Sequence, residues 1–241
     1  MNASQNAAYT ARSQAIVTGT SSGIGRAVAE KLLKEGWQVH GIDRSPAVIQ
    51  HAHFQAWNAD LTQPSQIDTL SQEILTTPPQ ALVHAAGVLR VGTLDQFDPQ
   101  DGQLMWQLHV DAAVRLGQRV LPLMRQARQG RVVMIGSRVS GGMPGRSLYA
   151  ASKSALIALA KSWASECVRD GVTVNVVSPA ATETPMLLDP QRSGTPPKLP
   201  PLGRLIQAEE VAALVHFLTL PEAAAITGQD LVMCGGASLN G

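Results

Sequence analysis

Short apolar segments alternate with helical patterns along nearly the whole chain, and no other feature limits the fold as strongly. The segments expected to be strands are residues 15–19, 38–43, 54–57, 81–87, 131–137, 172–178 and 230–236. Between them the spacing predicts helices over residues 23–35, 64–75, 101–128, 148–169 and 209–220, of which the third could break near His109. This alternation is typical of an α/β domain with a doubly wound parallel sheet and helices on both faces.

Length and composition favour a single globular domain. The 241 residues are 44% hydrophobic, which is enough for a sizeable core. The net charge of +1 offers no excess that would attract nucleic acid or an anionic membrane. No segment reaches the roughly 18 consecutive apolar residues of a membrane span. We therefore expect neither nucleic acid nor a membrane as a partner.

The cysteines and the first residues carry little functional signal. Cys167 and Cys234 form no CxxC pair and no metal-ligand cluster, so no metal site is expected. Residues 1–12 are polar and lack the apolar stretch of a secretory signal. We expect them to be a disordered tail that precedes the domain of residues 13–241, and we expect the protein to be cytoplasmic.

Residues 187–202 interrupt the alternation. They contain five prolines, at positions 190, 196, 197, 200 and 201. Proline lacks the backbone N–H that a helix needs, so this stretch cannot be a long helix. A long irregular excursion from a compact domain is typical of a mobile segment over a site, and residues 187–202 are predicted to be a substrate lid.

A glycine-rich turn, TGTSSGIG at residues 18–25, joins the first predicted strand to the first predicted helix. Gly19, Gly23 and Gly25 would let a pyrophosphate approach the backbone, where a Cβ would obstruct it. The N-terminus of the following helix would supply free N–H groups. Glycines alone would also suit a plain tight turn, but their place at this junction favours a dinucleotide site. The other candidate contacts in this turn are Ser21, Ser22 and Ile24.

Acidic residues follow the second and third predicted strands. Asp43 ends the second strand, where a carboxylate can accept hydrogen bonds from the adenine ribose and would repel a 2′-phosphate, which favours NAD. Arg44 is adjacent and could pair with that phosphate, which keeps NADP open as the cofactor. Asp60 and Leu61 could border the adenine, although Asp60 could equally cap the following helix.

Tyr149 and Lys153 are four residues apart in a predicted helix and therefore lie on one face. An ammonium near a phenol stabilises the phenolate and lowers the tyrosine pKa, which makes tyrosine useful as an acid and base. Ser137 comes at the end of the fifth predicted strand, where open parallel sheets bind ligands, and its hydroxyl could bond a substrate oxygen. A YxxxK pair is common on ordinary helices, so this spacing by itself does not establish a catalytic role.

The motifs taken together resemble the short-chain dehydrogenase/reductase family. They occur in the family's order: the glycine turn, AAG at residues 85–87, Ser137, YAASK at residues 149–153, and Ser178-Pro179. The resemblance implies a Rossmann fold with seven parallel strands, NAD(P) as the cofactor, and a homotetramer or homodimer. It implies that Tyr149 is the acid and base, that Lys153 lowers its pKa and holds the nicotinamide ribose, and that Ser137 orients the substrate oxygen. Further cofactor contacts implied by the resemblance are Ala85, Ala86, Gly87, Pro179, Ala180, Thr182 and Thr184.

Three positions depart from the family pattern. The family motif NNAG reads HAAG here, beginning at His84, and PG reads Pro179-Ala180. The asparagine that usually completes a catalytic tetrad, by holding a water behind the lysine, aligns with His109. His109 could take over that water, could alter the pH profile because histidine titrates near neutrality, or could be a satisfied helix histidine without a chemical role. We expect the first.

The substrate is less defined. Local matches resemble both the 2,3-dihydro-2,3-dihydroxybenzoate dehydrogenases and the 3-oxoacyl-(acyl carrier protein) reductases. Arg90, Arg138 and Arg146 flank the predicted site, and each could bind a substrate carboxylate or simply be solvated. We expect an alcohol dehydrogenase or ketoreductase for a small alcohol or ketone. The alternatives are an NADPH-dependent carbonyl reductase and a catalytically weak NAD-binding sensor.

Overall fold

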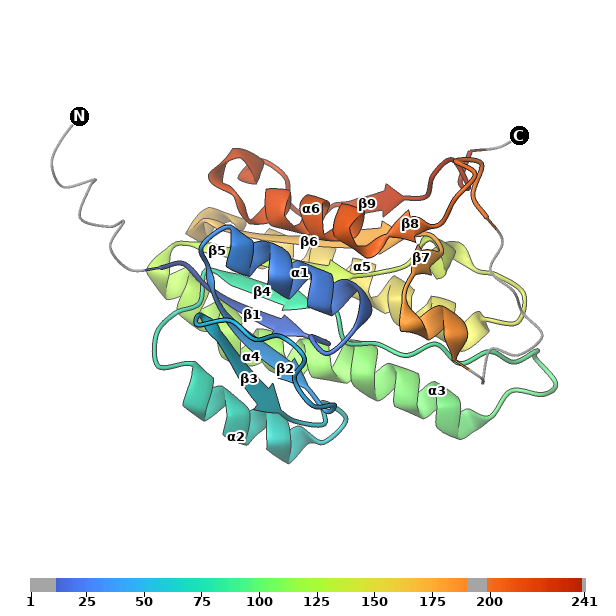
Figure 1. Ribbon diagram of the computed structural model, residues 1–241, viewed down its shortest axis with the longest axis horizontal. Coiled ribbons are helices and arrows are strands. Elements are labelled where there is room, and N and C mark those ends of the chain that lie inside the picture. Colours follow the sequence, from blue (N-terminus) through green and yellow to red (C-terminus); the bar gives the residue numbers. More distant parts are fainter. Residues whose placement is uncertain (1–11, 190–198, 240–241) are drawn as a thin grey trace, which may run out of the picture.

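A seven-stranded parallel sheet forms the centre of the computed structural model, which describes residues 12–189 and 199–239 (Figure 1). The strand order is β3-β2-β1-β4-β5-β6-β9, with β1 between β2 and β4. The sheet's strands are β1 (Gln14–Thr18), β2 (Gln38–Asp43), β3 (Phe54–Asn58), β4 (Ala81–His84), β5 (Gly130–Ile135), β6 (Val172–Pro179) and β9 (Asp230–Met233). The doubly wound parallel sheet expected from the sequence is confirmed, and its order reverses between β1 and β4, where such sheets bind ligands.

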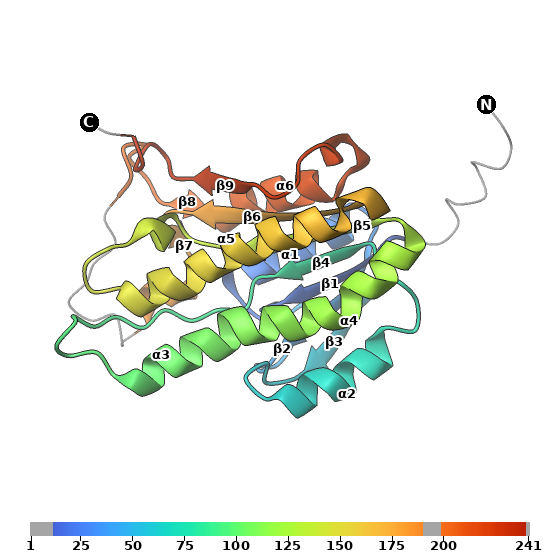
Figure 2. The same cartoon turned by 180° about the vertical axis from the view of Figure 1, so that it is seen from behind.

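Helices cover both faces of the sheet because the strands are apolar on both sides. In β1, Ala15 and Val17 pack with helices α1 (Gly23–Lys34) and α6 (Ala208–Thr219), while Ile16 points to the opposite face. That second face carries α2 (Pro64–Ile74), α4 (Ala112–Ala127) and α5 (Ser147–Cys167), which lie in front of the sheet in Figure 2. Alternate side chains of one strand thus enter two separate cores.

The long helix expected over residues 101–128 has three parts. Helix α3 (Pro99–Trp106) and helix α4 are joined by a π-helical turn, η3 (Gln107–Asp111). His109 lies within this turn, at the place where the sequence could break the helix. A π turn accommodates an extra residue without ending the helix, and such turns are frequent at functional sites.

Several short strands and 3₁₀ helices were not predicted from the sequence. Strands β7 (Thr182–Glu183) and β8 (Ile206–Gln207) pair as a separate two-stranded sheet. The 3₁₀ helices η4 (Arg138–Gly141) and η6 (Pro185–Leu188) lie beyond the carboxyl ends of β5 and β6, whereas η5 (Val168–Asp170) and η8 (Pro221–Ala223) precede β6 and β9. Residues 1–11 of the predicted tail and 190–198 of the predicted lid lie outside the described residues. In the part of the chain that the structure describes, no helix is long and apolar enough to cross a membrane.

Candidate active site

A cavity of about 540 Å³ opens over the carboxyl ends of the central strands. It brings together predicted site residues from eight separate segments of the chain. Of the predicted site residues, those lining the cavity are Gly19, Ser22, Gly23, Ile24, Gly25, Asp43, Asp60, Leu61, Ala85, Ala86, Gly87, His109, Ser137, Tyr149, Lys153, Pro179, Ala180, Thr182 and Thr184. Ser21 does not line it, and its backbone N–H instead donates to the Asp43 carboxylate.

The glycine turn packs closely against its own backbone and that of the Ala85–Ala86 segment, which is possible only because its glycines lack side chains. Gly19 has a φ of +78°, and a Cβ there would lie 3.0 Å from the backbone of Ala86. A Cβ on Gly25 would lie 2.2 Å from the carbonyl oxygen of Gly19. Helix α1 begins directly at this turn, and Ser22 before it makes no side-chain capping bond, so the first N–H groups are available to an anion.

The part of the cavity next to β2 and β3 carries two carboxylates. Asp43 accepts hydrogen bonds from the backbone N–H of Ser21 at 2.9 Å and of Ser45 at 2.8 Å, so it is held rigidly at the end of β2. Asp60 accepts from both the N–H and the hydroxyl of Thr62. The alternative that Asp60 caps the next helix is wrong, because α2 begins at Pro64 and Gln63 occupies the position before it.

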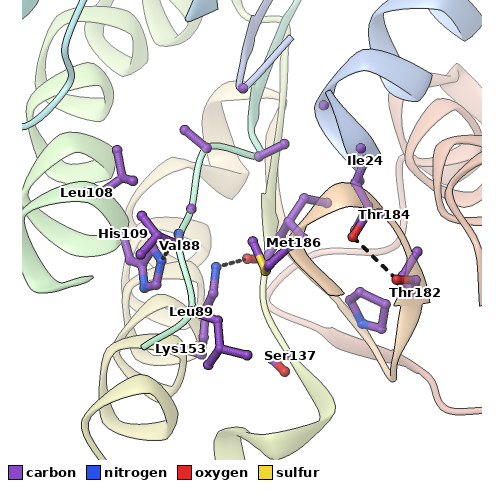
Figure 3. A pocket seen from close by; sticks show the side chains of 18 of the residues that line it. Ile24, Val88, Leu89, Leu108, His109, Ser137, Lys153, Thr182, Thr184 and Met186 are labelled. Carbon is purple, nitrogen blue, oxygen red and sulfur yellow. Dashed lines mark hydrogen bonds between the residues drawn. The ribbon is translucent and has the colours of Figure 1, made fainter. Parts of the chain in front are cut away.

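Tyr149 and Lys153 lie on the cavity side of α5, as their spacing predicts. Both are buried, and the Lys153 ammonium lies 5.9 Å from the centroid of the Tyr149 ring. Lys153 Nζ donates to the carbonyl oxygen of Ile135, the last residue of β5, at 2.7 Å (Figure 3). Burial lowers the pKa of Lys153 from 10.5 to about 7, since desolvation disfavours the ammonium. Ser137 follows β5 directly and lines the same cavity.

His109 is completely buried, and both of its ring nitrogens have protein partners. Nε2 accepts a hydrogen bond from the backbone N–H of Val88 at 3.1 Å, and Nδ1 lies 2.9 Å from Ser152 Oγ. Ser152 donates its own proton to the carbonyl of Tyr149, so Nδ1–H must donate to Ser152. These bonds define a neutral Nδ1–H tautomer. Burial, the nearby Lys153 charge and His84 hold the pKa of His109 well below 6.5.

His84, at the end of β4, is also buried with both ring nitrogens hydrogen-bonded, but in the opposite tautomer. The oxygen of Thr18 accepts from the backbone N–H groups of Ala85 and Ala86, which leaves the Thr18 hydroxyl proton to donate to His84 Nδ1. His84 Nε2–H then donates to the carbonyl oxygen of Leu108 in the π turn. Burial and the Lys153 charge lower the pKa of His84 to about 4. His84 therefore connects the π turn to β1 and β4, and His109 connects the same turn to Val88 and to α5.

Sequence reasoning gave no role to Ser152 or Thr18, although each completes one of these hydrogen-bond chains. Ser152 lies between Tyr149 and Lys153 in the sequence, and this placement was the available signal. Thr18 is fully buried beneath the glycine turn. Their histidine partners, His109 for Ser152 and His84 for Thr18, lie more than 40 residues away, which spacing cannot reveal.

One of the three candidate arginines is already paired within the protein. Arg90 forms ion pairs with Asp101 at 3.3 Å and Asp189 at 3.1 Å, and it also donates to the carbonyl of Leu89. Its charge is therefore neutralised by two carboxylates. The interpretation of Arg90 as a binder of a substrate carboxylate is not supported, whereas Arg138 and Arg146 both line the cavity.

The described residues also offer a test of whether a nicotinamide dinucleotide fits. The glycine turn before α1, Asp43 at the end of β2, and the Tyr149–Lys153 pair of α5 all line one cavity. The uncapped N–H groups at the start of α1 suit the phosphates of a dinucleotide, because they are donors without a partner in the helix. A single cavity that extends from β2 past this turn to α5 suits a long dinucleotide. No group of three or more potential metal ligands occurs among the described residues.

Comparisons with known proteins agree with this geometry. Residues 19–238 match a family model described as Enoyl-(Acyl carrier protein) reductase. The chain belongs to the short-chain dehydrogenase/reductase family. It is an NAD(P)-dependent oxidoreductase that acts between an alcohol and a carbonyl carbon, as the family resemblance implied.

Relatives of known structure or name cover nearly the whole chain. The 3-oxoacyl-[acyl-carrier-protein] reductase of Escherichia coli (strain K12) is 37% identical over 234 residues, which are 92% of this chain and 96% of the relative. The 2,3-dihydro-2,3-dihydroxybenzoate dehydrogenase of the same organism is 35% identical over 238 residues, with the same coverage. A solved 3-oxoacyl (acyl-carrier-protein) reductase from Agrobacterium tumefaciens C58, with NADP bound, has a TM-score of 0.84, 28% identity and 93% coverage of both chains.

Proposed function

We propose that this chain is a dehydrogenase or reductase of small alcohols and ketones in which Tyr149 is the acid and base. The observation that carries the proposal is the meeting of Tyr149, Lys153 and Ser137 in the cavity that the glycine turn also lines. These residues come from the end of β5 and from α5, while the turn precedes α1. A sensor that only binds the dinucleotide would not need a buried tyrosine and lysine beside it.

Ser137, Tyr149 and Lys153 have separate roles in the proposed reaction. The Ser137 hydroxyl donates a hydrogen bond to the substrate oxygen and holds it beside Tyr149. In the oxidation direction the Tyr149 phenolate takes the hydroxyl proton, and in the reduction direction the phenol returns it. The Lys153 ammonium stabilises the phenolate, and burial of the group excludes competing water. The bound dinucleotide supplies or accepts the hydride.

His109 is a positioning residue in this proposal. Its two hydrogen bonds join Val88, which follows the glycine of the AAG motif, to Ser152, the neighbour of Lys153. Because both ring nitrogens already have protein partners, we propose that His109 holds Ser152 and the Val88 segment in place and does not hold a relay water. Replacing His109 with Ala should lower kcat more than it weakens NADH binding. Unchanged turnover across the pH range would remove any role in the reaction.

We propose NAD as the preferred cofactor. The support is the Asp43 carboxylate, which two backbone N–H groups hold at the adenine end of the cavity. A 2′-phosphate there would meet this negative charge. The second candidate is an NADPH-dependent 3-oxoacyl reductase, favoured by Arg44 on the cavity wall and by the named activity of relatives. The ratio of the NADH and NADPH dissociation constants distinguishes them.

We also propose a cytoplasmic homotetramer or homodimer. Trp106 on α3 and Leu148 on α5 are large apolar side chains left 46% and 39% exposed, which suits burial against a second copy. Sedimentation of the purified protein measures the oligomeric state directly.

The central test combines a variant with two measurements. Tyr149→Phe keeps the ring and its packing but removes the hydroxyl. It should bind NADH as tightly as the unchanged protein while losing at least about 100-fold in turnover, the scale of general acid–base catalysis. The substrates are a panel of cyclic and aliphatic alcohols and ketones, followed by NADH absorbance. Full activity of this variant would contradict the proposed role.

A further inference from the structure

Beyond the glycine turn and the reacting groups, the cavity has a third region, next to Ser137. A small apolar cluster forms its walls, with Leu89, Val139, Met143 and Met186 packed around Tyr149. In Figure 3, Leu89 is drawn beside Lys153 and Ser137, while Met186 comes from the same segment as Thr184. We call this region the substrate chamber. Its apolar walls suit the carbon skeleton of a small molecule.

Two arginines border the substrate chamber. Arg138 follows Ser137 and begins η4, and Arg146 immediately precedes α5, three residues before Tyr149. Both line the cavity. The segment between them contains Gly141, Gly142 and Gly145, where an added Cβ would meet no atom within 4 Å, so the segment has room to adjust around a ligand.

Arg138 is the less satisfied of the two cations. Its Nε is buried and has no hydrogen-bond partner. None of the ion pairs among residues 12–189 and 199–239 includes Arg138. A guanidinium is always charged, and a buried donor without a partner is costly, so this position favours an anionic partner from outside the chain.

The acidic residues of the cavity lie too far away to fill that role. Among the described lining residues the only carboxylates are Asp43 and Asp60, which follow β2 and β3. Arg138 follows β5, and β1 and β4 lie between β2 and β5. Three strand spacings separate Arg138 from Asp43, about 14 Å. That exceeds the screening length of about 8 Å at physiological ionic strength. The cavity therefore has an acidic adenine end and a basic substrate end.

Resting on the proposed function, we propose that the substrate is a small hydroxy or oxo acid whose carboxylate pairs with Arg138. The apolar walls hold the carbon skeleton, Ser137 and Tyr149 hold the reacting oxygen, and the Arg138 guanidinium holds the carboxylate. Planar guanidinium and carboxylate groups can form two parallel hydrogen bonds, which fixes the orientation of the substrate as well as its affinity. Arg138 is thus a specificity-determining residue.

Matched probes test the charge requirement. We would compare reduction of 3-oxocyclohexanecarboxylate and of 3-oxocyclohexanecarboxamide, which differ in charge but little in shape. The acid should have a kcat/KM about 10- to 100-fold higher, the range of a charge-assisted hydrogen bond. Arg138→Gln should abolish that preference, and Arg138→Lys should restore part of it. Equal use of acid and amide by the unchanged protein would overturn the proposal.

The control variant is Arg131→Gln at the other end of β5. The Arg131 Nε is also buried without a partner, but its guanidinium donates to the Gly130 and Gly171 carbonyls and does not line the cavity. This variant should keep the preference for the acid. An Arg138→Gln variant that keeps it, or a preference that only Arg146→Gln removes, would overturn the assignment to Arg138.

Binding without turnover separates this inference from the proposed function. Calorimetry with saturating NADH or NADPH compares cyclohexanecarboxylate with cyclohexanecarboxamide, neither of which can react. Tighter binding of the carboxylate that Arg138→Gln removes supports the proposal even if no probe is turned over, a result that would count against the proposed activity. Equal binding of both, or preference for a neutral 3-oxoacyl thioester as substrate, would overturn it.

Discussion

Single residues explain why the reacting groups could be predicted while their surroundings could not. Tyr149 and Lys153 share one helix, so their four-residue spacing places them on one face without any tertiary information. The partners of His109 and His84 come from other segments, and their tautomers follow only from which neighbours donate. The sequence therefore predicts the chemistry of the site better than the contacts that hold it.

Lys153 leads to a prediction about stability and pH. Its pKa is about 7 in the folded protein, below the 10.5 of an exposed lysine, because the group is buried. Between these values the unfolded chain binds more protons, so stability rises with pH. For one group with these two pKa values, raising the pH from 7 to 9 adds about 2 kcal/mol. Lys153→Met should lack this gain in urea unfolding of the cofactor-free protein.

An exposed lysine on the same helix provides the control. Lys161→Met should gain stability between pH 7 and pH 9 as the unchanged protein does, because Lys161 is exposed on α5. If Lys153→Met gained the same amount, the lysine would not be the source of the pH dependence.

At the scale of elements, long periodic segments were predicted well and short ones were missed. All seven strands of the main sheet and the helices between them occur within a few residues of their expected positions. The break expected near His109 is a π turn that keeps the helix continuous. Strands β7 and β8 have two residues each, too few to show an alternating pattern, and they pair only because the chain returns to the rim.

The turn before α1 gives a prediction that belongs to this scale. In Gly25→Ala the new Cβ would lie 2.2 Å from the Gly19 carbonyl oxygen and 2.7 Å from that of Thr18, both of them backbone atoms. The turn must therefore open. NADH affinity should fall by at least about 10-fold, equivalent to 1.4 kcal/mol of distortion, in a fluorescence titration.

Gly36→Ala is the matched control, because Gly36 follows the C-terminal end of the same helix and a Cβ there meets no atom within 4 Å. Its φ of +85° strains alanine by about 1 kcal/mol, which should lower the melting temperature but leave NADH affinity unchanged. NADH binding by Gly25→Ala at the original affinity would show that the turn does not hold the cofactor.

On the scale of the whole molecule, the two buried histidines join parts that lie far apart in the chain. Through Thr18 and Leu108, His84 connects β1, β4 and the π turn, and His109 extends the connection to α5. All of these elements meet beneath the cavity, so the integrity of the site and the stability of the fold depend on the same neutral side chains. This coupling could not be predicted from the sequence, because it depends on the order of the strands in the sheet.

Acid should therefore weaken the entire fold. The pKa of His84 is about 4 in the folded protein, and that of an exposed histidine is 6.5. As the pH falls from 6.5 towards 4 the unfolded chain binds more protons, so stability is lost within that window. For His84 alone the loss of stability between pH 7.5 and pH 5 is about 2 kcal/mol, and His109, whose pKa is also lowered, adds to it in the same direction.

Urea unfolding at pH 7.5 and pH 5 should show a smaller loss of stability for His84→Asn than for the unchanged protein, and the smallest loss for the double variant with His109→Asn. The exposed His51→Asn should leave the loss unchanged, and an undiminished loss in the double variant would mean that other groups control acid stability.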